Sequence, residues 1–83
     1  MNLTASQNVT RTYVELCEGL GPPTFQQSFS TLLLALDLNG QTQFATRVWN
    51  RVTAAFNGRG ESYAQQTLDD YWTQILRFGS DGN

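Results

Sequence analysis

The chain has 83 residues, contains no histidine and no lysine, and has a net charge of −2 from five arginines and seven acidic side chains. This length allows one domain around a single hydrophobic core. Histidine is the commonest general base and lysine the usual Schiff-base nucleophile, so their absence argues against an enzyme. The acidic balance argues against nucleic-acid binding as the main role, because that role needs a basic excess.

Neutral polar residues replace much of the usual charge. Charged residues make up 14% of the chain, whereas about 25% is usual in a globular domain. Ten Thr, eight Gln, six Asn and five Ser take their place. A surface of hydroxyls and amides has little charge repulsion and suits close association between copies. A compositional bias of the source genome would produce the same pattern.

The cysteine count and the N-terminus bear on location. The single cysteine, Cys17, excludes a disulfide within the chain. Residues 1–4 show neither the basic nor the apolar region of a signal peptide. The longest apolar run, residues 32–36, is too short to cross a membrane. We therefore expect an intracellular or virion-associated protein without membrane partners, cofactors or bound metal.

The first predicted helix spans residues 5–18. Its apolar face consists of Val9, Tyr13, Leu16, Cys17 and Leu20, which recur at helical spacing. Thr4 or Ser6 is suited to cap its start, and Gly19 stands where a left-handed residue often ends a helix. A Gly-Pro-Pro sequence then prevents continuation. On this face, Cys17 is expected to be a small buried apolar residue.

The second predicted helix spans residues 24–38. Thr24 and Gln27 match a capping box, in which each side chain bonds the backbone N–H of the other residue. The core face consists of Phe25, Phe29, Leu32, Leu33 and Leu36. We expect Asn39-Gly40 to end this helix.

The third predicted helix spans residues 42–56 and has the clearest amphipathic pattern. Its apolar residues fall within an arc of about 140° on a wheel of 100° per residue; they are Phe44, Ala45, Val48, Trp49, Val52, Ala55 and Phe56. Two glycines in the sequence Asn57-Gly-Arg-Gly60 are expected to break the helix there.

The fourth predicted helix spans residues 62–78, and Ser62 with Gln65 matches a second capping box. Its apolar face consists of Leu68, Tyr71, Trp72, Ile75, Leu76 and Phe78. Gly79 is expected to close the helix, and residues 80–83 should form a disordered tail.

These elements predict an all-α protein, a single compact four-helix bundle within one domain of residues 1–83. No segment alternates apolar and polar residues as a strand would. The predicted core consists of Phe29, Leu33, Leu36, Phe44, Val48, Val52, Leu68, Trp72 and Ile75.

Two leucines make the second predicted helix unusual. Leu34 and Leu38 lie at about 180° and 220° on the wheel, opposite the core face, with Ala35 beside them. An all-round apolar helix is either central in its domain or covered by a partner. An 83-residue bundle has little room to surround a helix, so we expect a partner to contact Leu34 and Leu38. The alternative is that Leu38 belongs to a helix C-cap.

Arg47 and Arg51 flank the apolar arc of the third predicted helix, and Arg59 follows it. Together they could form a small patch for an anion or an RNA backbone, with Trp49 as a stacking surface. The simpler interpretation is the solvated polar face of a helix, which we favour.

The acidic residues show no pattern that requires a metal or acid–base chemistry. The loop that begins at Asp37 has Thr42 and Val48 where a calcium-binding EF-hand needs glycine and a bidentate glutamate. Four other carboxylates project from polar faces, where we expect simple solvation; they are Glu15, Glu18, Asp69 and Asp70.

Residues 41–48, Gln-Thr-Gln-Phe-Ala-Thr-Arg-Val, are similar to the Gln-Thr-Gln-containing helix of tobamovirus-type rod coat proteins. The similarity covers about a tenth of the chain, and it implies a viral structural or accessory role. We therefore predict a non-catalytic protein–protein interaction or self-assembly module, with a homo-oligomer or a protein partner. The alternatives are a small nucleic-acid-associated factor that uses the three arginines, and an inhibitor or adaptor that blocks a larger protein.

Overall fold

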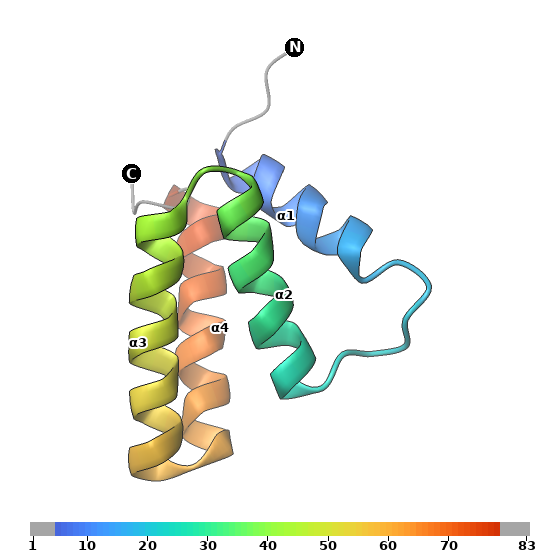
Figure 1. The fold of residues 1–83 in the computed structure, drawn as a ribbon. Coiled ribbons are helices and arrows are strands. Elements are labelled where there is room, and N and C mark those ends of the chain that lie inside the picture. The colour runs from blue at the N-terminus through green and yellow to red at the C-terminus, as the bar shows by residue number, and fades with distance from the viewer. Residues whose placement is uncertain (1–4, 79–83) are drawn as a thin grey trace.

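The computed structural model describes residues 5–78, and side chains for residues 8–77. It confirms the predicted all-α fold, a single four-helix bundle (Figure 1). The helices are α1 (Ala5–Leu16), α2 (Phe25–Leu38), α3 (Thr42–Arg59) and α4 (Glu61–Phe78). Within this range there is no strand. The expected helix cap at Thr4, the closing Gly79 and the tail lie outside the described residues.

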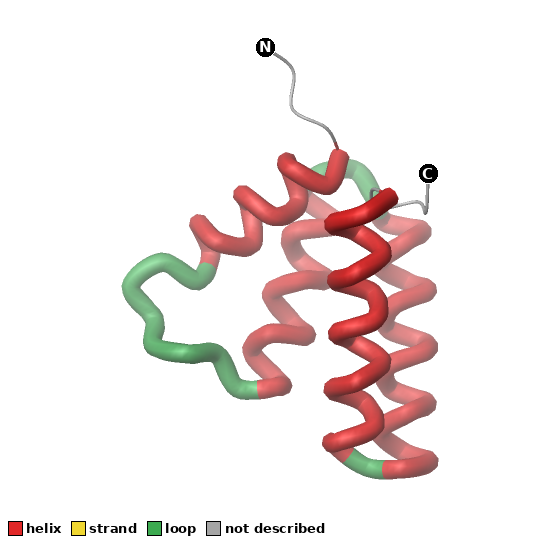
Figure 2. Tube along the Cα trace, turned by 180° about the vertical axis from the view of Figure 1, so that it is seen from behind, coloured by secondary structure: helices red, strands yellow, loops and turns green. Residues whose placement is uncertain are grey.

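The two longest helices, α3 and α4, form an antiparallel hairpin, and α2 packs alongside it (Figure 1). Helix α1 crosses the bundle at a steep angle and packs on α2 and α4. Seen from behind, the loop that joins α1 to α2 arcs outward, away from the rest of the bundle (Figure 2). Because α1 does not pack against α3 in the described structure, one side of the α2–α3 pair is left without a covering helix.

Both ends of α2 are capped by local hydrogen bonds. The Gln27 backbone N–H donates to Thr24 Oγ1 at 3.1 Å, and the Thr24 N–H donates to Gln27 Oε1 at 3.0 Å, which confirms the predicted capping box. At the other end, Gly40 has φ +76° and its N–H donates to Asp37 O, while the Gln41 N–H donates to Leu36 O at 2.8 Å. This pair of bonds is a Schellman motif.

We expect Thr24→Ala to lower the free energy of unfolding by about 1 kcal/mol, because it leaves an N-terminal N–H of α2 without its acceptor. Thr24→Ser keeps the hydroxyl and should stay close to the wild type. Urea unfolding followed by circular dichroism would measure both variants. Equal stability of the Ala and Ser variants would contradict this role of the hydroxyl.

Helix α1 ends at Leu16, two residues before the predicted end. The Glu18 N–H donates to Glu15 O and the Leu20 N–H to Cys17 O, so the chain tightens into a turn. Gly19 follows with φ +83°, as its position predicted. The prediction for Cys17 is therefore wrong: it is a half-buried thiol in the turn and not a buried residue of the helix.

The junction of α3 and α4 differs from the predicted loop. Helix α3 continues through Asn57 and Gly58 to Arg59, and Gly60 alone leaves the helical conformation, with φ +87° and ψ −176°. Its N–H donates to Phe56 O, and its carbonyl accepts the N–H of Ala64, so this one residue ends one helix and starts the next.

The second predicted capping box does not form. Helix α4 begins at Glu61, which places Ser62 inside its first turn. The Gln65 side chain instead donates from Nε2 to Asp69 Oδ1 at 3.0 Å. Gly60 makes the sharp turn before α4 and stands at the N-cap position. Ser62 therefore does not act as the N-cap of α4.

The core lies where the four helices meet. All the predicted core residues are buried except Leu33 and Trp72, which are partly buried at its edge. Additional buried residues are Val9, Leu32, Ala35, Ala45, Ala55 and Ala64. The alanines have small side chains and allow neighbouring helices to approach closely. The rings of Trp72 and Tyr13 pack edge to face, with their centroids 4.7 Å apart. This pair places aromatic surface between α1 and α4.

Helix α1 is also attached to α2 by side-chain hydrogen bonds. The hydroxyls of Tyr13 and Ser28 lie 3.1 Å apart. Asn39 Nδ2 donates to Thr12 Oγ1 at 3.0 Å and to the Ala35 carbonyl at 2.8 Å. These bonds hold α1 against the buried side of α2 and leave the opposite side of α2 open.

Candidate functional site

The outer face of α2 presents two exposed leucines. Leu34 is 47% exposed and Leu38 is 62% exposed, although Leu32 and Leu36 on the same helix are completely buried. Residues four apart are neighbours on a helix surface, so Leu34 and Leu38 form one apolar patch, which we call the outer leucine pair. Ala35, expected beside them, is fully buried.

The capping alternative for Leu38 is wrong. In the Schellman motif at the end of α2, the residues that can make the accompanying apolar contact are Leu36 and Gln41. Leu38 occupies neither place, and most of its side chain is exposed to solvent. Its apolar surface therefore has no local structural use in the described chain.

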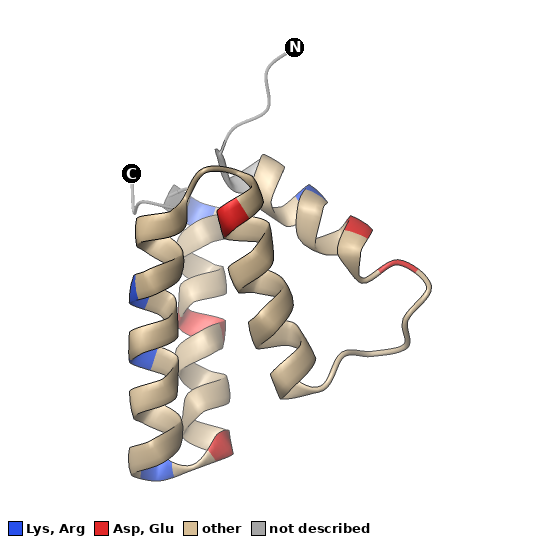
Figure 3. Ribbon diagram, in the orientation of Figure 1, with Lys and Arg blue, Asp and Glu red and all other residues tan. Residues whose placement is uncertain are grey.

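The three arginines share α3, which has no acidic residue (Figure 3). The Arg47 guanidinium lies 5.3 Å from the centre of the Phe44 ring, and that of Arg59 lies 4.8 Å from the centre of the Tyr63 ring. Both positions fit a cation over an aromatic ring. The side chains of Arg47 and Arg59 thus have partners within their own fold.

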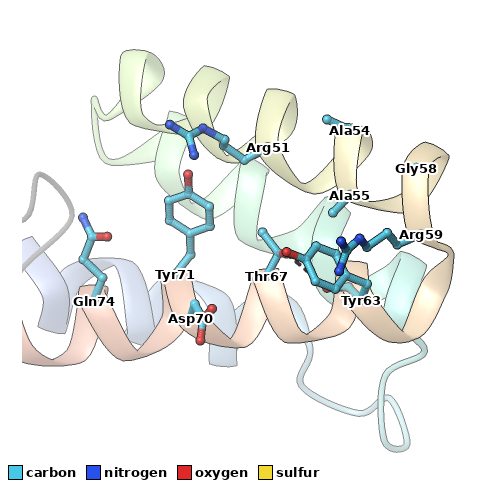
Figure 4. Close-up of a pocket in the computed structure, with 10 residues that line it drawn as sticks. All are labelled: Arg51, Ala54, Ala55, Gly58, Arg59, Tyr63, Thr67, Asp70, Tyr71 and Gln74. Carbon is cyan, nitrogen blue, oxygen red and sulfur yellow. Dashed lines mark hydrogen bonds between the residues drawn. The ribbon is translucent and has the colours of Figure 1, made fainter.

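Arg51 and Arg59 line a polar groove of about 700 Å³ between α3 and α4 (Figure 4). Tyr63, Asp70 and Tyr71 line it from α4. The two arginines are eight residues apart, about 12 Å along the helix axis, so both side chains would have to extend toward each other to contact one phosphate. Asp70 adds a negative charge to the same groove. This arrangement does not concentrate positive charge at one point of the groove.

Arg47 and Arg51 are neighbours on the surface of α3, but the structure does not place all three arginines of the alternative patch in one groove. Arg47 lies outside the polar groove, in a separate shallow depression with Gln43 and Thr46. Trp49, the expected stacking partner, lines a different groove, between α2 and α3. An RNA backbone bound by Arg51 and Arg59 would therefore pass close to the carboxylate of Asp70 and away from Trp49.

An aromatic groove of about 730 Å³ runs between α2 and α3. Four rings line it in a row, in the order Phe56, Phe25, Phe29 and Trp49. Successive ring centroids are 6.1, 5.9 and 5.6 Å apart, and the planes of each pair lie within 25° of one another. This stacking joins the two rings of α2, Phe25 and Phe29, to the two rings of α3.

Two of these rings belong to the predicted apolar arc of α3, and the structure leaves both of them half exposed. Trp49 is 52% exposed and Phe56 is 47% exposed. Both lie at one edge of the 140° apolar arc of α3, while its centre faces α2 and α4. The width of the arc was a signal for this groove, because one buried stripe accounts for a little over 100°.

The acidic residues form no further site in the part of the chain that the structure describes. The carboxylates at positions 15, 18, 69 and 70 are all exposed, as expected. Glu15 pairs with Arg11 at 3.7 Å on the surface of α1. Among residues 5–78, no three Cys, Asp or Glu side chains gather as metal ligands would. None of the described helices combines the length and apolar character that spanning a membrane requires.

Comparisons with known proteins found no relative. No family model matches the chain, and neither a curated protein nor a solved structure matches it. The functional assignment therefore depends on the geometry of these surfaces.

Proposed function

We propose that this chain is a non-catalytic assembly module that self-associates through the outer leucine pair on α2. The observation that carries the proposal is the exposure of Leu34 and Leu38, 47% and 62%, on a helix whose other leucines are buried or partly buried. Exposed apolar patches on soluble domains often mark protein interfaces. The weakly charged surface permits the close approach that such an interface needs.

A contact with two-fold symmetry would bury the outer leucine pair of both copies at once. In an isologous dimer the same residues appear on both sides of the axis, so four leucines would become buried together. Each leucine is already about half buried, so completing its burial contributes about 1 kcal/mol. The sum, about 4 kcal/mol, corresponds to a factor of several hundred in the dissociation constant.

Size-exclusion chromatography with light scattering over a concentration series would test this contact. We expect the wild type to form a concentration-dependent oligomer, and Leu34→Glu/Leu38→Glu to be a folded monomer. Leu34→Gln/Leu38→Gln should also weaken association, which separates loss of apolar contact from added charge. Leu76 on α4 has the same 62% exposure as Leu38, so Leu76→Glu is the matched control.

A wild type that stays monomeric at every concentration would contradict self-association. A partner protein would then be the alternative occupant of the outer leucine pair, as an inhibitor or adaptor requires. Nucleic-acid binding is the second candidate, and its only support is the concentration of three arginines and no acidic residue on α3. It ranks lower because Arg47 does not line the polar groove of the other two arginines, and Asp70 does.

A further inference from the structure

We propose that the aromatic groove between α2 and α3 is a second docking site, which binds an amphipathic helix of another protein with a lysine or arginine at one end. This site is separate from the outer leucine pair. Phe25 and Phe29, on the groove side of α2, lie about 140° or more from Leu34 and Leu38 around the helix. The two surfaces can therefore be occupied at the same time.

The spacing of the exposed rings favours a helix as the occupant. Trp49 and Phe56 are seven residues apart on α3, two turns or about 10.5 Å along the axis. A partner helix that lies along α3 repeats its apolar positions at the same spacing, i and i+7. Phe25 and Phe29 form the floor between them, where Phe29 is buried and Phe25 partly buried.

The charge of the groove favours a basic end on that helix. Glu61 is the one charged residue among those that line the groove; the others are neutral polar or apolar. Glu61 and Phe25 also line a smaller adjoining depression of about 370 Å³ with Ser62, Gln65 and Gln66, again without a positive charge. The half-exposed Trp49 ring is a further surface that attracts a cation.

The residues around the rings match the usual composition of a binding site. Aromatic side chains are enriched at the centres of protein interfaces and contribute a large part of their binding energy. Hydroxyl and amide groups from Gln26, Ser30, Thr53 and Asn57 form the edge of the groove. Such a neutral edge can hydrogen-bond to the polar face of the partner helix. It repels neither positive nor negative side chains on that helix.

A random library of 18-residue peptides displayed on phage would select ligands of this groove directly, whatever protein supplies the natural helix. The library would be selected against the full chain, and the enriched peptides would be synthesised. We expect them to carry large apolar residues seven positions apart together with Lys or Arg. Trp49→Ala/Phe56→Ala should weaken their binding by about 30-fold or more, and Glu61→Gln by about threefold, with less effect at high salt.

Two controls test whether the effect belongs to this groove. Tyr63→Ala removes a ring of similar exposure from the polar groove on the other side of α3, and it should leave peptide binding unchanged. Leu34→Glu/Leu38→Glu should also leave it unchanged, even where it abolishes self-association. Circular dichroism would show that each variant remains folded.

Three results would overturn the proposal. The first is that no peptide is enriched, and the second is that enriched peptides bind Trp49→Ala/Phe56→Ala as tightly as the wild type. The third is that Trp49→Ala/Phe56→Ala converts an oligomeric wild type to a monomer, which would make the groove a contact between copies. Enriched peptides that lack basic residues would overturn the role assigned to Glu61.

Discussion

Leu32→Ala is expected to lower the free energy of unfolding by about 2–5 kcal/mol, whereas Leu34→Ala should lower it by about 1 kcal/mol or less. The two leucines are two residues apart on α2. Leu32 is completely buried in the core, and its truncation would leave a cavity there. Leu34 is 47% exposed and leaves no enclosed cavity.

Urea unfolding followed by circular dichroism, at concentrations low enough to keep the chain monomeric, would compare these variants. A small domain has only about 5–15 kcal/mol of stability in total, so the Leu32 variant should unfold at a much lower urea concentration than the wild type. Equal losses for both variants would mean that Leu34 is covered within the monomer. That result would also contradict the use of the outer leucine pair as an interface.

Gly60→Ala is expected to destabilise the chain by about 1–3 kcal/mol, and Gly58→Ala to stabilise it by about 0.5–1 kcal/mol. A Cβ at either position would meet no atom within 4 Å, so sterics with neighbouring groups do not decide the outcome. Backbone conformation decides it. Gly60 has φ +87° and ψ −176°, a region that is almost restricted to glycine, while Gly58 is helical.

Thermal and urea unfolding of the two glycine variants would measure these opposite effects. Gly60 forms the entire connection between α3 and α4, so strain there acts on the longest pair of helices. Gly58→Ala reduces the freedom of the unfolded chain and favours the helix at that position. A stabilising Gly60→Ala would show that the junction tolerates a different backbone path.

The local sequence predicted most of the secondary structure. The capping box of Thr24 and Gln27, the left-handed Gly19 and the end of α2 at Asn39-Gly40 all depend on interactions within a few residues. The error at the junction of α3 and α4 has a tertiary cause. At 57–60, two glycines suggested a loop, yet a helix tolerates Gly58 at a cost of about 1 kcal/mol, which the packing of α3 on α4 offsets.

The candidate sites depended more strongly on the arrangement of the helices. The exposure of Leu34 and Leu38 agrees with their places opposite the core face of α2, which the helical period predicts. The aromatic groove was not predicted, because Trp49 and Phe56 occupy the same apolar arc as Val48 and Val52. Only the positions of α2 and α4 around α3 distinguish the covered part of that arc from the open part.

Composition and periodicity alone therefore establish an all-helical chain, the approximate helix boundaries, the faces that each helix presents and the absence of histidine and lysine chemistry. These properties follow from each residue and its near neighbours. The tertiary structure decided which apolar residues are covered, because burial depends on the neighbouring helix. It also showed that α1 packs on α2 and α4, that Arg47 is apart from the groove of Arg51 and Arg59, and that four rings line one groove. Those contacts join segments distant in sequence, and no local pattern specifies them.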